Sequence, residues 1–284
     1  MTGGEAVPRF DWAASTGDHW LANADRLEAQ LAPISELLFS RAGLAPGLSV
    51  LDVGCGRGST TRAAAMLIGD GRAIGLDLSP AMIAGARDLD PMQQCTWIAA
   101  DATDADLSRL ATDVVISRFG LMFFAEPIRA MANVRRALRP GGRLVAVAFQ
   151  QRHESPFQHL LFTAAADAAA QHGLSLPLGA PDGGAFAFGR PEVVDQILRE
   201  AGWTEVRFER HLVPLHIAGP GATPNEASRL LLGTGPIADW LASVDRVVRD
   251  DIIGAMEQEL TSHFDGVGMC LDAGVALITA ETAG

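Results

Sequence analysis

An α/β fold built around a mostly parallel sheet is predicted by three features of this chain. Short apolar runs recur through residues 48–150, and several of them end in an acidic residue. Helical signals separate successive runs, which is the alternation expected of parallel strands joined by crossover helices. A glycine-rich turn directly follows the first run, as in folds that bind ligands at the carboxyl edge of the sheet.

The clearest motif is the sequence Val-Leu-Asp-Val-Gly-Cys-Gly-Arg-Gly at residues 50–58. Its apolar first half is typical of the end of a buried parallel strand, and three glycines then follow at alternate positions. Glycines permit a sharp turn and let a ligand lie directly against the backbone. Ser59 and Thr60 then begin a helix, whose free N–H groups face the same crevice. The motif therefore predicts a nucleotide-type pocket.

The spacing of these glycines distinguishes between ligands. A dinucleotide-binding loop reads Gly-x-Gly-x-x-Gly and holds a pyrophosphate at the helix N-terminus. Here Ser59 occupies the position of the third glycine of that pattern. Asp52 precedes the loop, where a carboxylate repels a phosphate and attracts an ammonium group. The loop therefore favours a cationic ligand over a dinucleotide.

A second acidic strand end follows at residues 73–77, Ala-Ile-Gly-Leu-Asp. Asp77 lies about 20 residues beyond the loop, where nucleotide-binding folds place a ribose-binding carboxylate. Leu78 and Met82 flank it and are candidate apolar walls for an adenine ring. The Ser-Pro pair at residues 79–80 predicts a helix start, with serine as the cap and proline in the first turn.

Three further strand signals complete the series. One run ends at Asp101, the next runs into Arg118, and the turn Leu-Arg-Pro-Gly-Gly-Arg-Leu at residues 138–144 is expected to close a helix and begin a fifth strand. Together with the acidic-x-Gly-x-Gly-x-Gly loop, this ordered series resembles the class I S-adenosylmethionine (SAM) methyltransferases over roughly residues 48–150.

The resemblance implies a Rossmann-like, seven-stranded, mostly parallel sheet with helical cap insertions, and SAM as the cofactor. In that family the acid at the position of Asp101 contacts the adenine amino group, helped by the backbone of the next residue. Arg118 has two interpretations, because it could bind an anionic acceptor or be an ordinary surface arginine. The candidate cofactor-binding residues are Asp52, Gly54, Cys55, Gly56, Gly58, Thr60, Asp77, Leu78, Met82, Asp101, Ala102, Ser117 and Arg118.

The same pattern divides the chain into five segments. The N-terminal helices and the SAM-binding core take residues 1–150, and a cap insertion follows at 151–189. A core helix and strand take 190–217, a second cap insertion takes 218–266, and a closing core strand takes 267–284. We expect the insertions to position the methyl acceptor and to exclude water, since the core holds the donor.

Apolar periodicity predicts the helices outside the motifs. Residues 20–42 are expected to form one amphipathic helix, with Asp18 as its cap and Gly43 at its end. Another helix is expected over about 157–172. In the second insertion, one helical face is predicted to carry Leu241, Val244, Val248 and Ile252.

Composition restricts the partners. The net charge of −12 disfavours nucleic acids and anionic membranes, which bind basic surfaces. Three scattered cysteines indicate free thiols in a reducing compartment, and neither they nor the seven histidines show the spacing of a metal site. The first five residues lack a secretory pattern, and no apolar run is long enough to span a membrane. We expect a cytoplasmic protein that acts on a small molecule; its oligomeric state is left open.

A general base is needed only if the acceptor must lose a proton. His153 and Glu154 follow the fifth strand directly and are candidates for an oriented acid–base pair, although solvated loop residues would look the same. His19 lies beside Trp20 near a helix start. It could close over the donor or simply cap its helix. These three residues are the candidate catalytic groups.

Phenylalanines gather after the fourth strand and again in the first insertion, so we expect a small, rather apolar acceptor. Oxygen, nitrogen and carbon all remain open as the accepting atom. Two other functions are compatible with the fold type. An NAD-dependent oxidoreductase would use a similar sheet, although Ser59 and Asp52 argue against it. A non-catalytic SAM-binding module would keep the donor site without transferring the methyl group.

Overall fold

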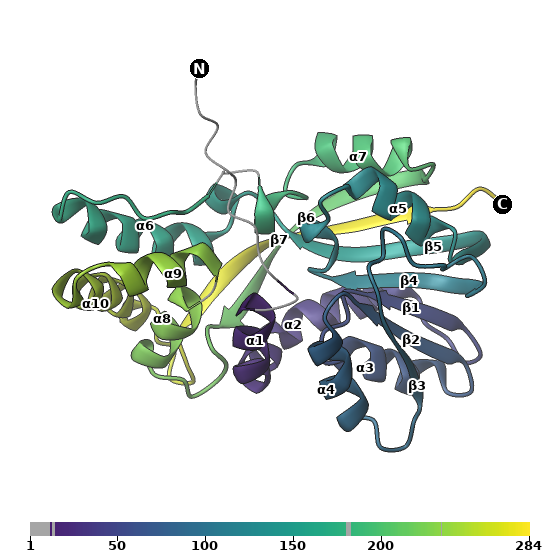
Figure 1. The fold of residues 1–284 in the computed structure, drawn as a ribbon, viewed down its shortest axis with the longest axis horizontal. Helices are drawn as coiled ribbons and strands as arrows, with labels where there is room; N and C mark the ends of the chain where they lie inside the picture. The colour runs from purple at the N-terminus through teal and green to yellow at the C-terminus, as the bar shows by residue number, and fades with distance from the viewer. Residues whose placement is uncertain (1–11, 13–14, 180–182, 234) are drawn as a thin grey trace.

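The computed structural model describes residues 12, 15–179, 183–233 and 235–284. Its centre is a seven-stranded sheet in the order β3-β2-β1-β4-β5-β7-β6 (Figure 1). Strands β1 to β5 pair in parallel, whereas β7 runs antiparallel to both β5 and β6. The strands are β1 Ser49–Val53, β2 Arg72–Asp77, β3 Cys95–Ala99, β4 Thr112–Arg118, β5 Leu138–Phe149, β6 Thr204–His216 and β7 Cys270–Glu281.

Helices cover the sheet and extend beyond one end of it. The α-helices are α1 Ser15–Ala22, α2 Ala24–Ala42, α3 Ser59–Ile68, α4 Pro80–Asp88, α5 Pro127–Arg135, α6 Pro156–Gln171, α7 Pro191–Glu200, α8 Pro224–Leu232, α9 Gly235–Ser243 and α10 Arg246–Ser262. The described residues also form three short 3₁₀ helices, which are η1 Leu121–Phe123, η2 Arg152–Glu154 and η3 Gly184–Phe186. No helix in these described ranges is long and apolar enough to cross a membrane.

The central strands are buried because helices lie on both faces of the sheet. Every residue of β1 is buried, and the middle of β4 and of β5 is buried as well. Such strands consist of continuous apolar runs rather than alternating ones. This explains why the apolar runs in the sequence were a reliable signal for the parallel sheet, and it confirms the predicted fold class.

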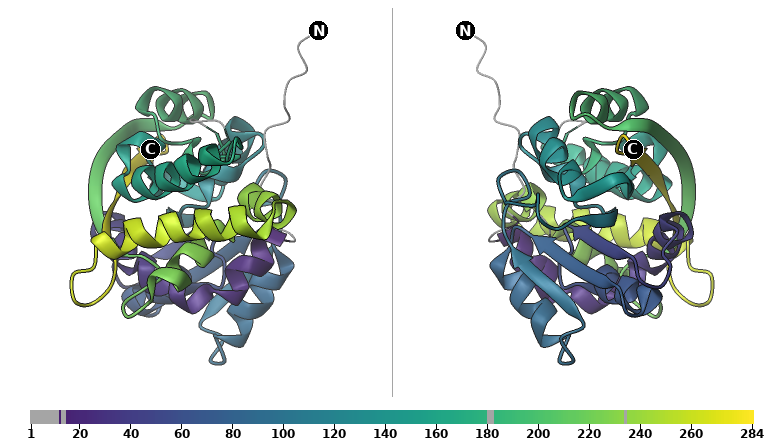
Figure 2. Two further views of the ribbon diagram at one scale, coloured as in Figure 1. Left: turned by 90° about the vertical axis from the view of Figure 1, so that its left-hand side faces the viewer. Right: turned by 90° about the vertical axis from the view of Figure 1, so that its right-hand side faces the viewer.

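A helical cap occupies the other half of the molecule (Figure 1). Beyond the end of β5, the strands β6 and β7 continue as a long antiparallel pair, and α6, α8 and α10 gather around this extension. Helix α10 packs against both α6 and α8, and its buried residues include Ile252, Met256 and Leu260. Figure 2 shows α10 lying across the end of the molecule. Helix α6 lies within the first predicted insertion, and α8 to α10 lie within the second.

The single helix expected over residues 20–42 is wrong. Two helices replace it, α1 and α2, and Asn23 separates them with φ −116° and ψ 12°. The Asn23 side chain donates a hydrogen bond to the carbonyl of His19, which competes with the helical pattern at that point. Asp18 consequently lies inside α1 rather than at a cap, whereas the end at Gly43 is confirmed by its left-handed φ of 58°.

Three other boundaries differ from the expectation. Strand β3 ends at Ala99, so Asp101 lies in the following turn. Helix α5 ends at Arg135, and the Pro-Gly-Gly turn belongs to the start of β5 rather than to a helix end. The apolar face expected in the second insertion is divided between α9 and α10, because the chain breaks between Ser243 and Arg246. The first five residues, which bear on the expected absence of a leader, lie outside the described part of the chain.

Candidate functional site

The strand order places the predicted site residues at one edge of the sheet. From β1 the chain moves through β2 to β3 on one side, whereas β4 and β5 pair on the other side. A crevice forms at such a reversal, outside the carboxyl ends of the strands. The glycine loop after β1, Asp77 at the end of β2 and Arg118 at the end of β4 all lie at this edge.

The three loop glycines are required for different reasons. All have a left-handed backbone, with φ between 54° and 75°. A methyl group on Gly54 would lie 2.6 Å from the Cα of Gly120, and one on Gly58 would lie 2.1 Å from the Trp97 ring. At Gly56, apart from the glycine itself and its two neighbours in the chain, no atom of the described residues lies within 4 Å of that position. Gly54 and Gly58 therefore serve internal packing, and Gly56 borders open space where a ligand can lie against the backbone.

Asp77 fixes the conformation of the loop. Its carboxylate accepts hydrogen bonds from the backbone N–H of Gly56 at 2.8 Å and of Ser79 at 2.9 Å. Burial raises the pKa of Asp77, and these two N–H donors lower it. Each carboxylate oxygen retains a further acceptor position, so the group can still bind a ribose hydroxyl. Leu78 next to it is 50% exposed and is free to contact an adenine ring.

Asp52 is a buried carboxylate beneath the loop. One oxygen accepts hydrogen bonds from the hydroxyls of Thr60 at 2.6 Å and Thr61 at 2.7 Å. The other oxygen, Oδ1, has no hydrogen-bond partner among the described residues. Burial raises the pKa of Asp52 to about 6, against the lowering effect of both threonines and of Arg118. A buried acceptor without a partner is costly, which favours a cation or a donor group at this edge.

Asp101 and Ala102 lie in the turn after β3. The Asp101 carboxylate is exposed and accepts a hydrogen bond from the N–H of Thr103 at 2.7 Å. The carbonyl of Ala102 accepts one from the side chain of Asn133 at 2.9 Å. The turn is thus anchored to α5, while the carboxylate stays accessible to a ligand.

Arg118 is neither a surface arginine nor a free anion-binding group. Its side chain is 8% exposed, and its Nη2 donates to both carboxylate oxygens of Glu28 at 2.6 and 2.7 Å. Its Nη1 donates to Ser35, and the hydroxyl of Ser59 donates to Glu28 at 2.6 Å. This network ties α2 to the end of β4 and to the start of α3. Sequence reasoning missed Glu28, because an acidic residue on a helix far from the motif gives no local signal.

Several other predicted cofactor-binding residues are buried. Each is at most 5% exposed, and they are Cys55, Thr60, Met82, Ala102 and Ser117. Ser117, for example, donates its hydroxyl to the carbonyl of Val53 at 2.7 Å, joining β4 to β1. Burial raises the pKa of the Cys55 thiol well above its usual value, so the group is a neutral filler.

Helix α1 covers this edge. At Gly17 a methyl group would lie 3.7 Å from the Ser79 hydroxyl, so α1 runs against the start of α4. On its other side, the Nε2–H of His19 donates to the carbonyl of Leu230 in α8 at 3.2 Å. Helix α1 therefore lies between the cap and the sheet edge that carries the glycine loop, Asp77 and Arg118, as Figure 1 shows. We call this edge the donor edge.

The predicted pair of His153 and Glu154 does not form. His153 is exposed on η2, and the Glu154 carboxylate lies 3.4 Å from the Nε of Arg210 instead. No hydrogen bond joins the two side chains in the part of the chain that the structure describes. Local sequence adjacency predicted the pair, but a 3₁₀ turn directs neighbouring side chains in different directions.

Aromatic residues gather at the ends of β4 and β5. The Phe119 and Phe149 rings stack with centroids 4.1 Å apart, and Trp12 meets Phe123 edge-on at 4.8 Å. Phe119 has a left-handed φ of 66°, which is costly for an aromatic residue and places the ring at the end of β4. Turn η1 also contacts η3, where Phe186 is buried. The edge is thus apolar on the side of β4 and β5 and acidic on the side of β1 and β2.

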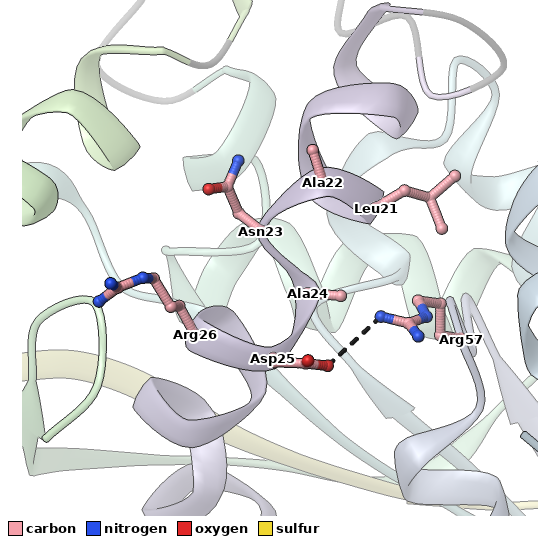
Figure 3. A pocket seen from close by; sticks show the side chains of 7 residues that line it. All are labelled: Leu21, Ala22, Asn23, Ala24, Asp25, Arg26 and Arg57. Carbon is pink, nitrogen blue, oxygen red and sulfur yellow. Dashed lines mark hydrogen bonds and ion pairs between the residues drawn. The ribbon is translucent and has the colours of Figure 1, made fainter.

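A separate hollow lies where α1 meets α2. It has a volume of about 260 Å³ and is lined by Leu21, Ala22, Asn23, Ala24, Asp25, Arg26 and Arg57. Figure 3 shows Arg57 reaching from the glycine loop toward Asp25, and their charged groups are 3.5 Å apart. The break at Asn23 opens this hollow on the outer side of the loop. It is slightly smaller than typical ligand pockets of about 300–1,000 Å³.

The residues at the donor edge fit an adenosyl sulfonium. The space over Gly56 admits a ligand against the backbone, and Asp77 offers acceptors for ribose hydroxyls. Asp52 adds a second carboxylate beneath the loop, so a pyrophosphate would meet two carboxylates here, whereas a cationic ligand would not be repelled.

Known proteins agree with this geometry. A family model described as methyltransferase domain matches residues 51–146. Nocamycin O-methyltransferase from Saccharothrix syringae is 29% identical over 266 residues, covering 88% of this chain and 90% of that protein. Demethylmenaquinone methyltransferase from Renibacterium salmoninarum is 33% identical over 122 residues, which cover 43% of this chain and 50% of that protein. The match thus spans about half the length of the demethylmenaquinone methyltransferase.

Solved structures agree in fold. Phosphoethanolamine N-methyltransferase 2 from Haemonchus contortus, determined with S-adenosylhomocysteine, has a TM-score of 0.57 at 17% identity. The match covers 96% of this chain and 60% of that one. With the domain match and the loop geometry, these findings lead to one conclusion: residues 51–146 form a methyltransferase domain, in a chain with the class I SAM-dependent methyltransferase fold.

Proposed function

We propose that this methyltransferase transfers the methyl group of SAM to a small, apolar metabolite. The observation that carries the proposal is the open space over Gly56, whose N–H is hydrogen-bonded to Asp77. Stacked aromatic rings lie at the ends of the neighbouring strands β4 and β5. The relatives named for nocamycin and demethylmenaquinone support a small-molecule acceptor. An NAD-dependent oxidoreductase is not favoured, given the family and the two carboxylates at the loop.

Bound SAM supplies a methyl group that its sulfonium already activates. The chain then has to hold donor and acceptor in line, and such positioning can lower the barrier by roughly 7–11 kcal/mol. Asp77 and the glycine loop hold the donor in this proposal. Helix α1 and the cap close over it, so that water is excluded and the shifting charge is stabilised in a drier site.

His19 is our proposed general base for an acceptor that must lose a proton. Because the carbonyl of Leu230 can only accept, the Nε2 of His19 carries the hydrogen in that contact. In the neutral form with this tautomer, Nδ1 has the lone pair that would accept the proton. His19 is half-buried on α1, where the cap meets the donor edge, whereas His153 is exposed and lacks an orienting partner in the described chain.

A binding and turnover experiment tests the proposal. Calorimetric titration should give saturable binding of SAM and of S-adenosylhomocysteine, and no binding of NADH. Incubation with methyl-labelled SAM and a panel of apolar phenols, carboxylic acids and quinols should then transfer label to at least one compound. Binding of NADH in place of SAM would contradict the donor assignment. Binding of SAM without label transfer to any acceptor would favour the non-catalytic module.

A further inference from the structure

Three side chains of types that commonly bind metal ions meet at the tip of the β6–β7 extension, outside the donor site. They are His216 at the end of β6, Cys270 at the start of β7 and Asp265 in the loop between α10 and β7. One ligand atom from each lies within 4.8 Å of the others. The sequence does not reveal the group, because 49 residues separate His216 from Asp265.

The backbone brings two of these side chains together. His216 and Cys270 are direct partners in the antiparallel register of β6 and β7. Residues directly opposite each other on such a pair project to the same face of the sheet. The ring of His216 lies against Gly268, where a methyl group would be only 3.1 Å from its Cδ2 atom. This contact leaves little room for the imidazole to move away.

The third side chain is oriented by its own loop. The N–H groups of Val267 and Gly268 donate to Oδ1 of Asp265 at 2.9 and 3.0 Å. The other oxygen, Oδ2, faces the Nε2 of His216 at 3.0 Å. Outer contacts that fix a carboxylate in this way are typical of metal ligands. Asp265 thus presents one oxygen toward the imidazole and the thiol.

We propose that His216, Asp265 and Cys270 bind a divalent transition metal ion, with zinc preferred and water as the fourth ligand. An imidazole nitrogen, a thiolate and a carboxylate oxygen form a mixed donor set that suits tetrahedral zinc. Bonds of about 2.0–2.3 Å place tetrahedral ligand atoms roughly 3.3–3.8 Å apart, so only small side-chain adjustments are needed. Cys270 would release its thiol proton when the metal binds.

The position of the group gives the ion a structural role. The chain passes from β6 to α8 through residues 217–223 and from α10 to β7 through residues 263–269, so the three ligands lie where the second cap segment leaves and rejoins the sheet. The N–H of Ile217 also donates to the carbonyl of Met269 at 2.9 Å beside the ligands. A metal ion would therefore fasten the cap to the extension without touching the donor edge.

Cobalt titration of the full-length protein tests the site without any methyl transfer. After treatment with a chelator, Co²⁺ should produce a thiolate-to-cobalt charge-transfer band, and added Zn²⁺ should abolish it. Cys270→Ser and His216→Gln should lose the band, and zinc affinity should fall by more than about 100-fold. Cys95→Ser is the matched control, since Cys95 is also a partly buried free thiol, and it should retain both.

Thermal melting shows whether the variants fold and provides a second measurement. Zinc should raise the melting temperature of the wild type and of Cys95→Ser, but not that of a folded Cys270→Ser variant. The proposal is overturned if the wild type gives no charge-transfer band, or if Cys270→Ser binds zinc as tightly as the wild type. In that case the group is an ordinary hydrogen bond between His216 and Asp265 beside an unrelated thiol.

Discussion

The donor edge and the cap are built on different principles. At the donor edge, successive strand–turn–helix units of one continuous stretch place their ends side by side, so short local motifs determine the site. The cap instead assembles α6, α8 and α10 from two stretches that the core strand β6 separates. Local sequence therefore specifies the candidate donor site, and contacts between distant segments specify the cap that we propose surrounds the acceptor.

The donor edge also contains features that helix packing alone does not require. The donor edge combines three left-handed glycines, a left-handed Phe119 and the buried carboxylate of Asp52. In the cap, α6 packs against α10, and apolar side chains of both helices, such as Leu161 and Met256, are fully buried. Costly features gather where a protein binds or reacts, because stability alone would remove them. Variants should therefore separate into those that affect donor binding and those that do not.

The largest effect is expected at Gly56. Gly56→Val should place a side chain in the open space over the loop and weaken SAM binding at least about 100-fold, or roughly 3 kcal/mol. Gly141→Val is a matched control, because Gly141 also has a left-handed backbone, with φ 74°, and open space around it, but lies away from the site. Calorimetric measurement of the SAM affinity of both variants separates the effect of backbone strain from the effect of filling the cleft. Equal SAM affinities in Gly56→Val and Gly141→Val would contradict our account of the loop.

Turnover should depend on His19 next. His19→Gln can still donate to the Leu230 carbonyl but cannot accept a proton, so kcat should fall about 100-fold with an acceptor that loses a proton. SAM affinity should stay within about threefold, since the ring is not assigned to donor binding. His159→Gln, at an exposed position of α6, should have normal kcat. Full activity in His19→Gln would assign His19 a structural role only.

A smaller effect is expected at Asp77. Asp77→Asn removes the charged acceptor of both the Gly56 N–H and a ribose hydroxyl, and SAM affinity should fall about 10- to 50-fold. The exposed Asp88 on α4 provides a control with the same charge change, and Asp88→Asn should bind SAM normally. Calorimetry at one pH and salt concentration compares the two. Unchanged affinity in Asp77→Asn would remove Asp77 from the donor site.

The smallest effect concerns stability and pH. Burial raises the pKa of Asp52 to about 6, so the folded state holds its proton more tightly than the unfolded chain does. The stabilising contribution of the protonated group is complete below about pH 4 and is lost as the pH rises through about 6. The amide of Asp52→Asn stays neutral at every pH, so the variant does not lose stability through ionisation. It should therefore be about 1–2 kcal/mol more stable than the wild type at pH 8, a figure that includes the cost of the poorer hydrogen bonding of the amide.

Denaturant titrations at pH 4.5 and pH 8 measure this difference in the free energy of unfolding. The advantage of Asp52→Asn should be small at pH 4.5 and should reach its full size at pH 8. SAM binding should nevertheless weaken in this variant, because the negative charge at the donor edge is gone. A variant that is less stable than the wild type at pH 8 would show that the carboxylate stabilises the fold.

The sequence allowed much of the donor edge to be predicted, since its signals are local. The end of β1, the helix start at Ser59 and the serine cap at residue 79 follow from neighbouring residues alone. The partner of Arg118 could not be predicted, because Glu28 approaches only once α2 packs on the sheet. The break at Asn23 depends on one side-chain hydrogen bond within an otherwise continuous apolar pattern.

The cap was harder to predict for the same physical reason. Its helices were expected from apolar periodicity, but the division between α9 and α10 was not, because apolar residues continue across the break. The metal ligands we propose become neighbours only through the register of β6 and β7, and neither segment alone shows a ligand spacing. Pairing between distant strands is information that a local pattern does not contain.

The structure of the protein with S-adenosylhomocysteine is the most direct test of how the donor is held. Our account predicts that the ribose hydroxyls lie within hydrogen-bond distance of the Asp77 carboxylate and that the homocysteine portion crosses the loop at Gly56, beneath α1. A ligand bound away from both Gly56 and Asp77 would contradict it.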